Sequence, residues 1–354
     1  MEPIKSAGLS IYFESGLKPL RELLEQRKYS KIFVFADAHT AELCLPKFQE
    51  MMDGLEEFDI IETDPGEENK TIDFCIGIWK TLLDFEADRK SLMINLGGGV
   101  ITDMGGFVAS TYKRGIDFIN IPTTLLSQVD ASVGGKTGID VDHVKNMVGT
   151  FSLPQAVFIE HAFLTSLPER ELLSGFAEMI KHGLIAEADY FRQLKSEGKV
   201  TYTPATVYRS IEIKNEVVTS DPLEKGLRKI LNFGHTIGHA VESYALSHTK
   251  RPLTHGEAIA VGMVCEAFLS EKYGNLSASE LDEISTYITG LYPKYQIPEK
   301  SFSTLIELMQ SDKKNEEGQI MFSLLEKIGQ CSYNCMVTHH DIVASLTYYN
   351  SLTA

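Results

Sequence analysis

The chain has 354 residues, 43% of them hydrophobic, and carries a formal net charge of −16 at pH 7. This length is typical of two domains with sizeable buried cores. The negative charge argues against nucleic acid and against anionic membrane surfaces as partners. In so acidic a chain, a local cluster of lysine and arginine is informative.

The N-terminus and the cysteines both indicate the cytoplasm. The opening residues, MEPIKSAGLSIYFESG, lack the basic-then-apolar pattern of a secretory signal peptide. The longest clearly apolar run, at residues 258–269, contains Glu266 and is too short to span a bilayer, so it predicts a buried helix. The five cysteines are scattered and odd in number, which is typical of a reducing compartment.

Short apolar runs alternate with helical periodicity in the N-terminal half. Strands are predicted at residues 31–37, 59–63, 91–96, 117–122 and 156–161, with helices from residue 38 to 52, at 72–85 and at 100–112. This alternation predicts a parallel sheet covered on both faces. From about Glu169 helical patterns dominate, interrupted only by strand-like pieces at 319–325 and 331–337. We therefore predict an α/β domain over residues 1–166 and a helical domain over residues 167–354.

The segment LGGGVITDMGGF (96–107) follows a predicted strand and opens a predicted helix. Glycines let the backbone approach a phosphate closely, and a helix N-terminus offers N–H groups and the positive end of a dipole. The spacing departs from G-x-G-x-x-G because Thr102 holds the third glycine position. A nucleotide or phosphate ligand is favoured; the alternative is a plain turn in which Gly105 and Gly106 serve helix packing.

Two further features of this half leave alternatives open. Asp37, at the end of the first predicted strand, could accept ribose hydroxyls or cap a helix. The glycine-rich segment at residues 121–146 contains two of three clustered cations, Lys136 and Lys145, and Arg114 lies just upstream. It is either a solvated surface loop or a loop that wraps an anionic ligand.

Histidines in the second half indicate a metal site. His235 and His239, in NFGHTIGHAVE, share one face of a predicted helix, and His255 begins the next helix. This is not the zincin motif H-E-x-x-H, because Thr236 follows the first histidine. A carboxylate is needed to complete a three-ligand catalytic site, and Glu178 is the nearest helical candidate. The spacing alone leaves open which three of the four groups bind.

A second group of cysteine and histidine residues lies in CSYNCMVTHH (331–340). Its spacing matches no common zinc knuckle, and Cys331 and Cys335 fall on one face of a predicted strand. Core thiols beside an exposed histidine pair are therefore favoured over a metal site.

Taken in order, the motifs resemble the 3-dehydroquinate synthase family of the shikimate pathway. The resemblance covers nearly the whole chain and rests on PGEENK (65–70), GGGVITDMGGF, YKRG, IPTTLLSQVDASVGGKTG, KNMVGTF, LPERELLSGFAEMIKHG, GLRKILNFGHTIGHAVE, HGEAIAVGM and a late DKK (312–314). It implies a Rossmann-like N-terminal domain that binds NAD and a helical C-terminal domain that binds a divalent metal, zinc or cobalt. It also implies a homodimer and an active site between the domains.

The resemblance assigns residues to each ligand. The metal ligands would be Glu178, His235 and His255, whereas His239 resembles the family's substrate-side histidine. NAD would contact Asp37, Glu67, Lys70, Gly98, Gly99, Val100, Asp103, Thr123, Thr124, Lys136, Lys145, Phe163 and Ser166. The substrate would contact Asp130, Lys136, Asn146, Lys181, Lys214, Arg228, Asn232 and His239. Arg114 is similar to the family arginine that reaches the phosphate site of the partner subunit.

The family substrate, 3-deoxy-D-arabino-heptulosonate 7-phosphate, carries a carboxylate, a phosphate and vicinal hydroxyls. Arg228 suits the carboxylate because a guanidinium pairs bidentately, whereas Arg114, Lys136 and one of Lys313 and Lys314 suit the phosphate. The metal would acidify the hydroxyl at the carbon that NAD oxidises, and the resulting ketone would allow phosphate elimination. Return of the hydride, ring opening and aldol closure would then give 3-dehydroquinate.

Two positions depart from the family pattern. His39 stands where the family often has asparagine, which puts one nucleotide contact in doubt. Val144 stands where glycine is common, and the loss of backbone freedom predicts a local difference in that loop.

Three alternatives remain. A sister sugar-phosphate cyclase would act on sedoheptulose 7-phosphate or glucose 6-phosphate, but these substrates have no carboxylate for Lys214 and Arg228. A metal-dependent polyol dehydrogenase such as glycerol dehydrogenase would not need the cluster of anion-binding side chains. A catalytically inactive NAD-binding regulator is disfavoured because every candidate catalytic residue is present.

Overall fold

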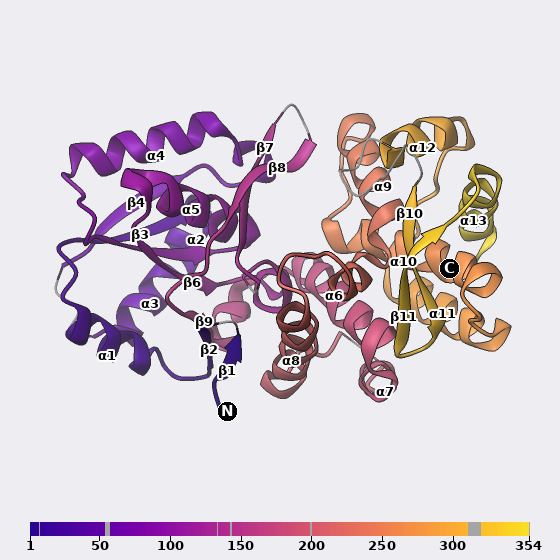
Figure 1. Ribbon diagram of the computed structural model, residues 1–354, viewed down its shortest axis with the longest axis horizontal. Coiled ribbons are helices and arrows are strands. Elements are labelled where there is room, and N and C mark those ends of the chain that lie inside the picture. The colour runs from indigo at the N-terminus through magenta and orange to yellow at the C-terminus, as the bar shows by residue number, and fades with distance from the viewer. Residues whose placement is uncertain are drawn as a thin grey trace. The chain divides into compact units, whose positions relative to one another are not determined.

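The computed structural model describes residues 1–6, 8–53, 57–132, 134–141, 144–198, 200–310 and 320–353. Lys313 and Lys314 lie outside the described residues. The chain forms two compact units: unit 1 contains Met1–Pro168 and Thr203–Asn215, and unit 2 contains Glu169–Tyr202 and Glu216–Ala354. Unit 1 thus takes in a segment from the helical half of the sequence. Figure 1 shows the sheet of unit 1 and the helices of unit 2.

Unit 1 is built on a seven-stranded sheet of order β1-β2-β9-β6-β5-β3-β4. The strands are β1 (Ile4–Ser6), β2 (Leu9–Phe13), β3 (Ile32–Asp37), β4 (Asp59–Thr63), β5 (Leu92–Gly97), β6 (Asp117–Pro122) and β9 (Val157–Ile159). All neighbours pair in parallel except β1 and β2, which are antiparallel. The predicted parallel sheet is confirmed, and the N-terminal strands β1 and β2 extend it beyond the prediction.

Helices cover both faces of this sheet (Figure 1), as predicted. They are α1 (Lys18–Arg27), α2 (Ala38–Leu43), α3 (Leu45–Met51), α4 (Ile72–Asp84) and α5 (Gly99–Thr111). Successive strand residues point to opposite faces. Phe33 and Phe35 therefore pack with Ile78 and Phe107 in one core, while Val34 packs in the other, on the face covered by α1 and α3.

The glycine-rich segment after β6 is more regular than either predicted loop. A π-helical turn at Ser127–Ala131 leads to a separate antiparallel hairpin of β7 (Lys136–Val141) and β8 (Val144–Phe151). The glycines allow this hairpin to form, since a Cβ at Gly149 would lie 2.0 Å from the Thr137 carbonyl oxygen. β7 and β8 are strands where a loop was predicted, because glycine serves close strand approach here, and binding of an anionic ligand stays a prediction.

Unit 2 is a helical assembly around one buried helix, α10 (His255–Tyr273). Its other helices are α6 (Glu169–Ala186), α7 (Ala188–Ser196), α9 (His235–His248), α11 (Ala278–Leu291), α12 (Phe302–Gln310) and α13 (His339–Ser351). The helix α8 (Pro204–Ser220) contributes to both units. Because α10 packs against α6, α9, α11 and α13, the buried helix predicted at residues 258–269 is confirmed.

A hairpin of β10 (Met321–Lys327) and β11 (Gln330–Met336) completes unit 2, so this unit is not purely helical. Cys331 and Cys335 are half-buried on β11, and the following His339 and His340 are exposed. Among the described residues, the groups with metal-ligand geometry do not include these four. No helix in the described part of the chain is long and apolar enough to cross a membrane.

Candidate metal centre and nucleotide-binding edge

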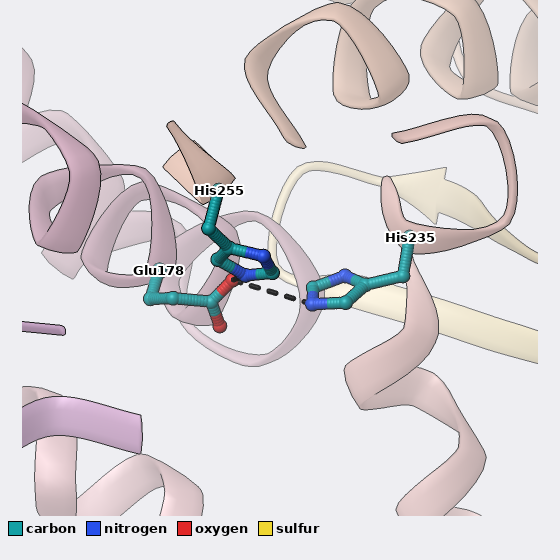
Figure 2. Close-up of side chains that lie close together, drawn as sticks. All are labelled: Glu178, His235 and His255. Carbon is teal, nitrogen blue, oxygen red and sulfur yellow. Dashed lines mark ion pairs between the residues drawn. The ribbon is translucent and has the colours of Figure 1, made fainter. Parts of the chain in front are cut away.

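Three helices of unit 2 bring Glu178, His235 and His255 together (Figure 2). Glu178 lies on α6, and the two histidines are the first residues of α9 and α10. The Glu178 Oε1 atom is 3.4 Å from His235 Nε2 and 3.5 Å from His255 Nε2. Two imidazole nitrogens and one carboxylate oxygen are a typical donor set for a catalytic zinc or cobalt ion with an open position. The residues therefore fit such a metal.

Each of these histidines is held through its second ring nitrogen. His235 Nδ1 is 3.1 Å from the Phe233 carbonyl oxygen, and His255 Nδ1 is 3.6 Å from Glu242 Oε2. Such outer contacts are typical of metal-binding histidines, because they turn the other nitrogen toward the metal. Burial lowers the pKa of His255, but the contacts with Glu178 and Glu242 outweigh it and raise the pKa to about 9.

A capping box fixes the start of α10 at His255. Thr254 accepts a hydrogen bond from the Glu257 N–H, and the Glu257 carboxylate accepts one from the Thr254 N–H. Arg170 of α6 binds Glu257 bidentately, with Nε–Oε1 and Nη2–Oε2 distances of 2.8 and 2.6 Å. This pair ties the first turn of α10 to α6, which carries Glu178.

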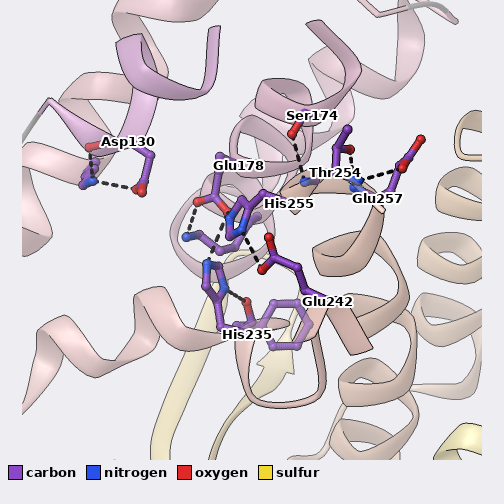
Figure 3. A network of polar contacts seen from close by, with 12 residues as sticks. Asp130, Ser174, Glu178, His235, Glu242, Thr254, His255 and Glu257 are labelled. Carbon is purple, nitrogen blue, oxygen red and sulfur yellow. Dashed lines mark hydrogen bonds and ion pairs between the residues drawn. The ribbon is translucent and has the colours of Figure 1, made fainter. Parts of the chain in front are cut away.

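The same two helices also meet through their backbones. The Gly256 N–H donates to Ser174 Oγ at 3.0 Å (Figure 3). A Cβ at Gly256 would lie 2.2 Å from the Ser174 carbonyl oxygen, so this approach requires glycine. Since Glu178 lies one turn after Ser174, the contact sets its distance from His255.

His239 and Lys181 adjoin the centre without being part of the Glu178–His235–His255 group. The His239 ring centroid is 5.1 Å from that of His235, and His239 forms a separate group with Glu242 and His255. Lys181 Nζ forms an ion pair with Glu178 Oε2. One Glu178 oxygen thus faces the histidines and the other faces a lysine.

A short 3₁₀ helix at Leu227–Asn232 carries the predicted carboxylate-binding arginine. Arg228 is 4% exposed and donates from Nη1 to the Pro222 carbonyl oxygen at 2.8 Å. Asp221 accepts the N–H groups of Gly226 and Arg228 at 2.7 and 3.1 Å, and these contacts hold its pKa below the usual value. Asn232 donates to Glu224 Oε1 at 3.1 Å.

Most of the predicted NAD residues of unit 1 lie at one edge of the sheet. They lie at or just after the carboxyl ends of parallel strands: Asp37 ends β3, Glu67 and Lys70 follow β4, Gly98, Gly99 and Val100 follow β5, Thr123 and Thr124 follow β6, and Phe163 and Ser166 follow β9; Asp103 is on α5, Lys136 on β7 and Lys145 on β8. In open parallel sheets this edge is where nucleotides bind.

The glycine turn between β5 and α5 was predicted to bind a phosphate, and this role stays a prediction. The first turn of α5 has no side-chain cap, and a Cβ at Gly98 would lie 3.0 Å from Thr124 Cγ2. A Cβ at Gly105 would lie 2.1 Å from Asn95 Oδ1, and one at Gly106 would lie 2.6 Å from Thr137 Cγ2. These two glycines serve packing, as the plain-turn alternative proposed, while the helix start offers N–H groups.

Asp37 caps the helix that follows its strand. Its carboxylate accepts the Thr40 N–H at 2.8 Å, and Thr40 Oγ1 accepts the Asp37 N–H at 3.0 Å. The capping alternative for Asp37 is therefore observed, and a ribose contact stays a prediction. His39, one of the departures from the family pattern, is exposed on α2.

The buried Lys70 contacts one residue that was predicted to bind NAD and one that was predicted to bind the substrate. Lys70 is 3% exposed, and its Nζ is 2.7 Å from Asp103 Oδ2 and 2.8 Å from Asn146 Oδ1. Asp140 accepts the N–H of Asn146 at 2.7 Å, which supports the left-handed backbone of that residue (φ 51°). Glu67 Oε1 lies 3.5 Å from Lys145 Nζ and 3.9 Å from Lys70 Nζ. We call Lys70, Asp103, Asp140 and Asn146 the Lys70 junction.

The remaining predicted substrate residues of unit 1 differ in exposure. Lys214 is 5% exposed, and its Nζ is 2.6 Å from Asp130 Oδ1. Lys136 is exposed at the start of β7. Arg114 is exposed in a turn where Lys113 and Arg114 both have positive φ, 48° and 68°. Consecutive left-handed residues other than glycine cost free energy and are found preferentially at functional sites.

Several supporting residues escaped the sequence analysis. Glu242 lies three residues after His239 on the same face of α9, so its helical spacing could have revealed it. Asp140 and Ser174 contact backbone N–H groups of residues 146 and 256, and no local pattern indicates such contacts.

Comparisons with known proteins identify the family of the chain. The family models for the 3-dehydroquinate synthase N-terminal and C-terminal parts match residues 60–174 and 175–315. The 3-dehydroquinate synthase of Parabacteroides distasonis is 44% identical over 335 residues, covering 93% of this chain and 94% of that protein. The one from Idiomarina loihiensis is 37% identical over 348 residues, covering 96% of each chain.

Among solved structures, 2-deoxy-scyllo-inosose synthase complexed with carbaglucose-6-phosphate, NAD+ and Co2+ is similar in fold. Its TM-score is 0.86 at 24% sequence identity, and the match covers 98% of this chain and 99% of that one. The family models together span most of the chain, and the curated relatives match it over nearly its full length. The chain therefore belongs to the 3-dehydroquinate synthase family.

Proposed function

We propose that the chain is a 3-dehydroquinate synthase, a phosphate-eliminating carbon–oxygen lyase that converts 3-deoxy-D-arabino-heptulosonate 7-phosphate to 3-dehydroquinate and phosphate. One observation carries the proposal: a chain of this family places Glu178, His235 and His255 within ligand distance of one another. Sister cyclases and polyol dehydrogenases are not favoured, because relatives that are 44% and 37% identical over nearly the full length are 3-dehydroquinate synthases.

Glu178, His235 and His255 would hold a zinc or cobalt ion. The structural neighbour 2-deoxy-scyllo-inosose synthase was solved with Co2+. When bound, such an ion acts as a Lewis acid that lowers the pKa of a substrate hydroxyl. Lys181 would fix the second oxygen of Glu178, and His239, beside the centre, would hydrogen-bond a substrate hydroxyl.

We assign NAD to the carboxyl edge of the unit 1 sheet. The uncapped start of α5, at Gly98, Gly99 and Val100, would receive the pyrophosphate. The other NAD contacts would be Asp37, Glu67, Lys70, Asp103, Thr123, Thr124, Lys136, Lys145, Phe163 and Ser166. The neighbour 2-deoxy-scyllo-inosose synthase was solved with NAD+ as well. When bound, NAD supplies a reversible hydride acceptor, so none would be consumed.

We assign the substrate contacts to individual side chains. Arg228 would pair with the carboxylate, because the Pro222 carbonyl oxygen orients its guanidinium and Asp221 holds its backbone N–H. Arg114 and Lys136 are exposed cations suited to the phosphate. The remaining contacts would come from Asp130, Asn146, Lys181, Lys214, Asn232 and His239.

Homodimer formation and a cytoplasmic location are part of the proposal. Met147, Val148 and Phe151 of the β7–β8 hairpin are 45%, 44% and 63% exposed, an apolar surface that a second copy could cover. Arg114 would then reach the phosphate site of the partner. All five cysteines are free thiols, which suits a reducing compartment.

Phosphate release tests the proposal. Purified protein is given NAD and cobalt with either 3-deoxy-D-arabino-heptulosonate 7-phosphate or sedoheptulose 7-phosphate. We expect release only from the first substrate, without net NADH, and loss of activity with a chelator. Release from the second would support a sister cyclase and contradict the role of Arg228. NADH accumulation with glycerol, without phosphate release from either sugar, would support a dehydrogenase.

A further inference from the structure

A fully buried carboxylate lies in the apolar middle of α10. Glu266 is 0% exposed, and its neighbours Val264, Cys265 and Ala267 are buried too. Burying a carboxylate is costly unless hydrogen bonds compensate it. Glu266 interrupts the apolar run that predicted this helix, and the proposed reaction assigns it no role.

Both oxygens of Glu266 accept hydrogen bonds from the backbone at the start of α9. The Gly234 N–H donates to Oε2 at 2.7 Å, and the Ile237 N–H donates to Oε1 at 3.0 Å. These two residues flank His235, the first residue of α9. The N-cap position of α9 provides no side-chain cap of its own. Glu266 therefore caps α9 from a neighbouring helix, where the positive end of the helix dipole favours a carboxylate.

Glycines allow α9 and α10 to approach closely enough for this contact. A Cβ at Gly262 would lie 1.9 Å from the Gly234 carbonyl oxygen, and one at Gly238 would lie 2.8 Å from Ile259 Cδ1. Gly234 itself has a φ of 79°, which favours glycine. Glu266 is one turn after Gly262 on the same face of α10, and it can thus reach the N–H groups of α9.

We infer that Glu266 is a positioning residue of the metal centre, which holds the first turn of α9 so that His235 faces Glu178 and His255. The inference rests on the metal assignment of the proposed function. The turn that Glu266 holds also contains the Phe233 carbonyl oxygen that contacts His235 Nδ1. A loosened turn would therefore change both the place and the rotation of the His235 ring.

A carboxylate suits this role better than other side chains. It is an acceptor at both oxygens, so it can satisfy two N–H groups at once. In Glu266→Gln one acceptor becomes an NH2 group that faces an N–H donor. In Glu266→Asp the side chain is one methylene shorter, so from the same helix position it cannot reach the N–H groups of both Gly234 and Ile237.

Cobalt binding to the full-length protein, stripped of metal with a chelator, tests the inference. We expect Glu266→Gln to weaken cobalt affinity about 10- to 100-fold and to change the visible absorption of the bound cobalt. Glu266→Asp should show a smaller change in the same direction. In the metal-free Gln variant, hydrogen exchange of the peptide spanning 233–238 should be faster than in the wild type.

Glu280→Gln is the matched control. Glu280 is also in unit 2, and its carboxylate accepts the backbone N–H groups of Ser277 and Ile328, both at 3.0 Å. Its loss removes a comparable pair of hydrogen bonds away from the proposed ligands. We expect Glu280→Gln to lower the melting temperature while cobalt affinity and absorption stay at wild-type values.

The outcomes separate the two proposals. Wild-type cobalt affinity and absorption in Glu266→Gln, with a lowered melting temperature as in the control, would overturn the positioning role. If Glu266→Gln does not fold, the cobalt affinity and absorption of Glu266→Asp test the positioning role instead. Absence of cobalt binding by the wild type would instead overturn the metal assignment, and the positioning role with it.

Discussion

The two candidate sites are built in opposite ways. The metal centre of unit 2 takes its two histidines from helix starts whose backbones are fixed by Thr254, Ser174 and Glu266, and its carboxylate from the middle of α6. The nucleotide edge of unit 1 takes its residues from strand ends and a hairpin, and there the predicted binding residues hold each other, as Lys70 does with Asp103 and Asn146.

This difference predicts how the sites respond to change. In unit 2 the supporting contacts and the ligands are separate residues, so a ligand can be removed with little loss of stability. In unit 1 the same side chains serve both purposes, so their replacement should lower stability and binding together. The four predictions below test this contrast, from the largest expected effect to the smallest.

Replacing His255 by alanine should abolish activity and leave the fold nearly intact. One of three metal ligands is lost, and Lewis-acid stabilisation of several kcal/mol corresponds to a loss of turnover of about a thousandfold or more. Phosphate release and metal content after dialysis measure the effect. Full activity with unchanged metal content would contradict the assignment of His255 as a metal ligand. A large fall in melting temperature would contradict the expectation that a ligand of unit 2 can be removed with little loss of stability.

Replacing Lys70 by methionine should destabilise unit 1. Lys70 is 3% exposed, and its removal leaves the half-buried Asp103 without its cation, at a cost of about 2–3 kcal/mol. Calorimetry should show a lower melting temperature, and NAD affinity should fall. Lys195→Met is the control, because its ion pair with Glu283 is exposed and worth at most about 1 kcal/mol. Equal effects of the two variants would contradict the prediction.

Replacing Arg228 by lysine should lower kcat/KM for the carboxylate substrate about 10- to 100-fold, since a bidentate, charge-assisted pair is lost. Lys229→Arg, at the next position, keeps a cation that contacts Asn334 and should leave kinetics unchanged. Steady-state phosphate release measures both variants. Unaltered KM and kcat in Arg228→Lys would show that this side chain does not contact the carboxylate.

Asp221 should give the smallest effect, and a pH-dependent one. Hydrogen bonds from the Gly226, Lys225 and Arg228 N–H groups lower its pKa below the ordinary value of 3.8. A lowered pKa means that its stabilisation is present above pH 3.8 and is lost as pH falls through the lowered value. The melting temperatures of wild type and Asp221→Asn should therefore differ by a constant amount from pH 5 to 8. A difference that does not shrink at lower pH would contradict this.

The sequence was most informative where one local pattern decides the structure. Apolar runs such as residues 91–96 identified the central strands, and the spacing of His235 and His239 identified a helix face. The β7–β8 hairpin was missed because its glycines, such as Gly149, mark close strand approach rather than a loop. The placement of Thr203–Asn215 in unit 1 depends on which surfaces pack together, and periodicity does not contain that information.

The same limit applies to the candidate sites. The spacing of the sequence indicated His235, His239, His255 and Glu178 as candidate ligands, but family resemblance was needed to choose which three bind. Glu266 looked like a mere interruption of an apolar helix, because its partners are backbone N–H groups 29 and 32 residues earlier in the chain. Contacts between side chains and distant backbone leave no periodic trace in a sequence.

The Lys70 junction has a consequence for the affinities of NAD and substrate. Lys70 bonds Asp103, which we assign to the dinucleotide, and Asn146, which we assign to the substrate. A ligand that recruits Asn146 changes the surroundings of Lys70, and with them the free energy of the other ligand. Thermodynamic reciprocity requires that each ligand alter the dissociation constant of the other by the same factor. On these assignments we expect the dissociation constants of NAD and substrate to be coupled, so each should differ when it is measured with and without the other ligand.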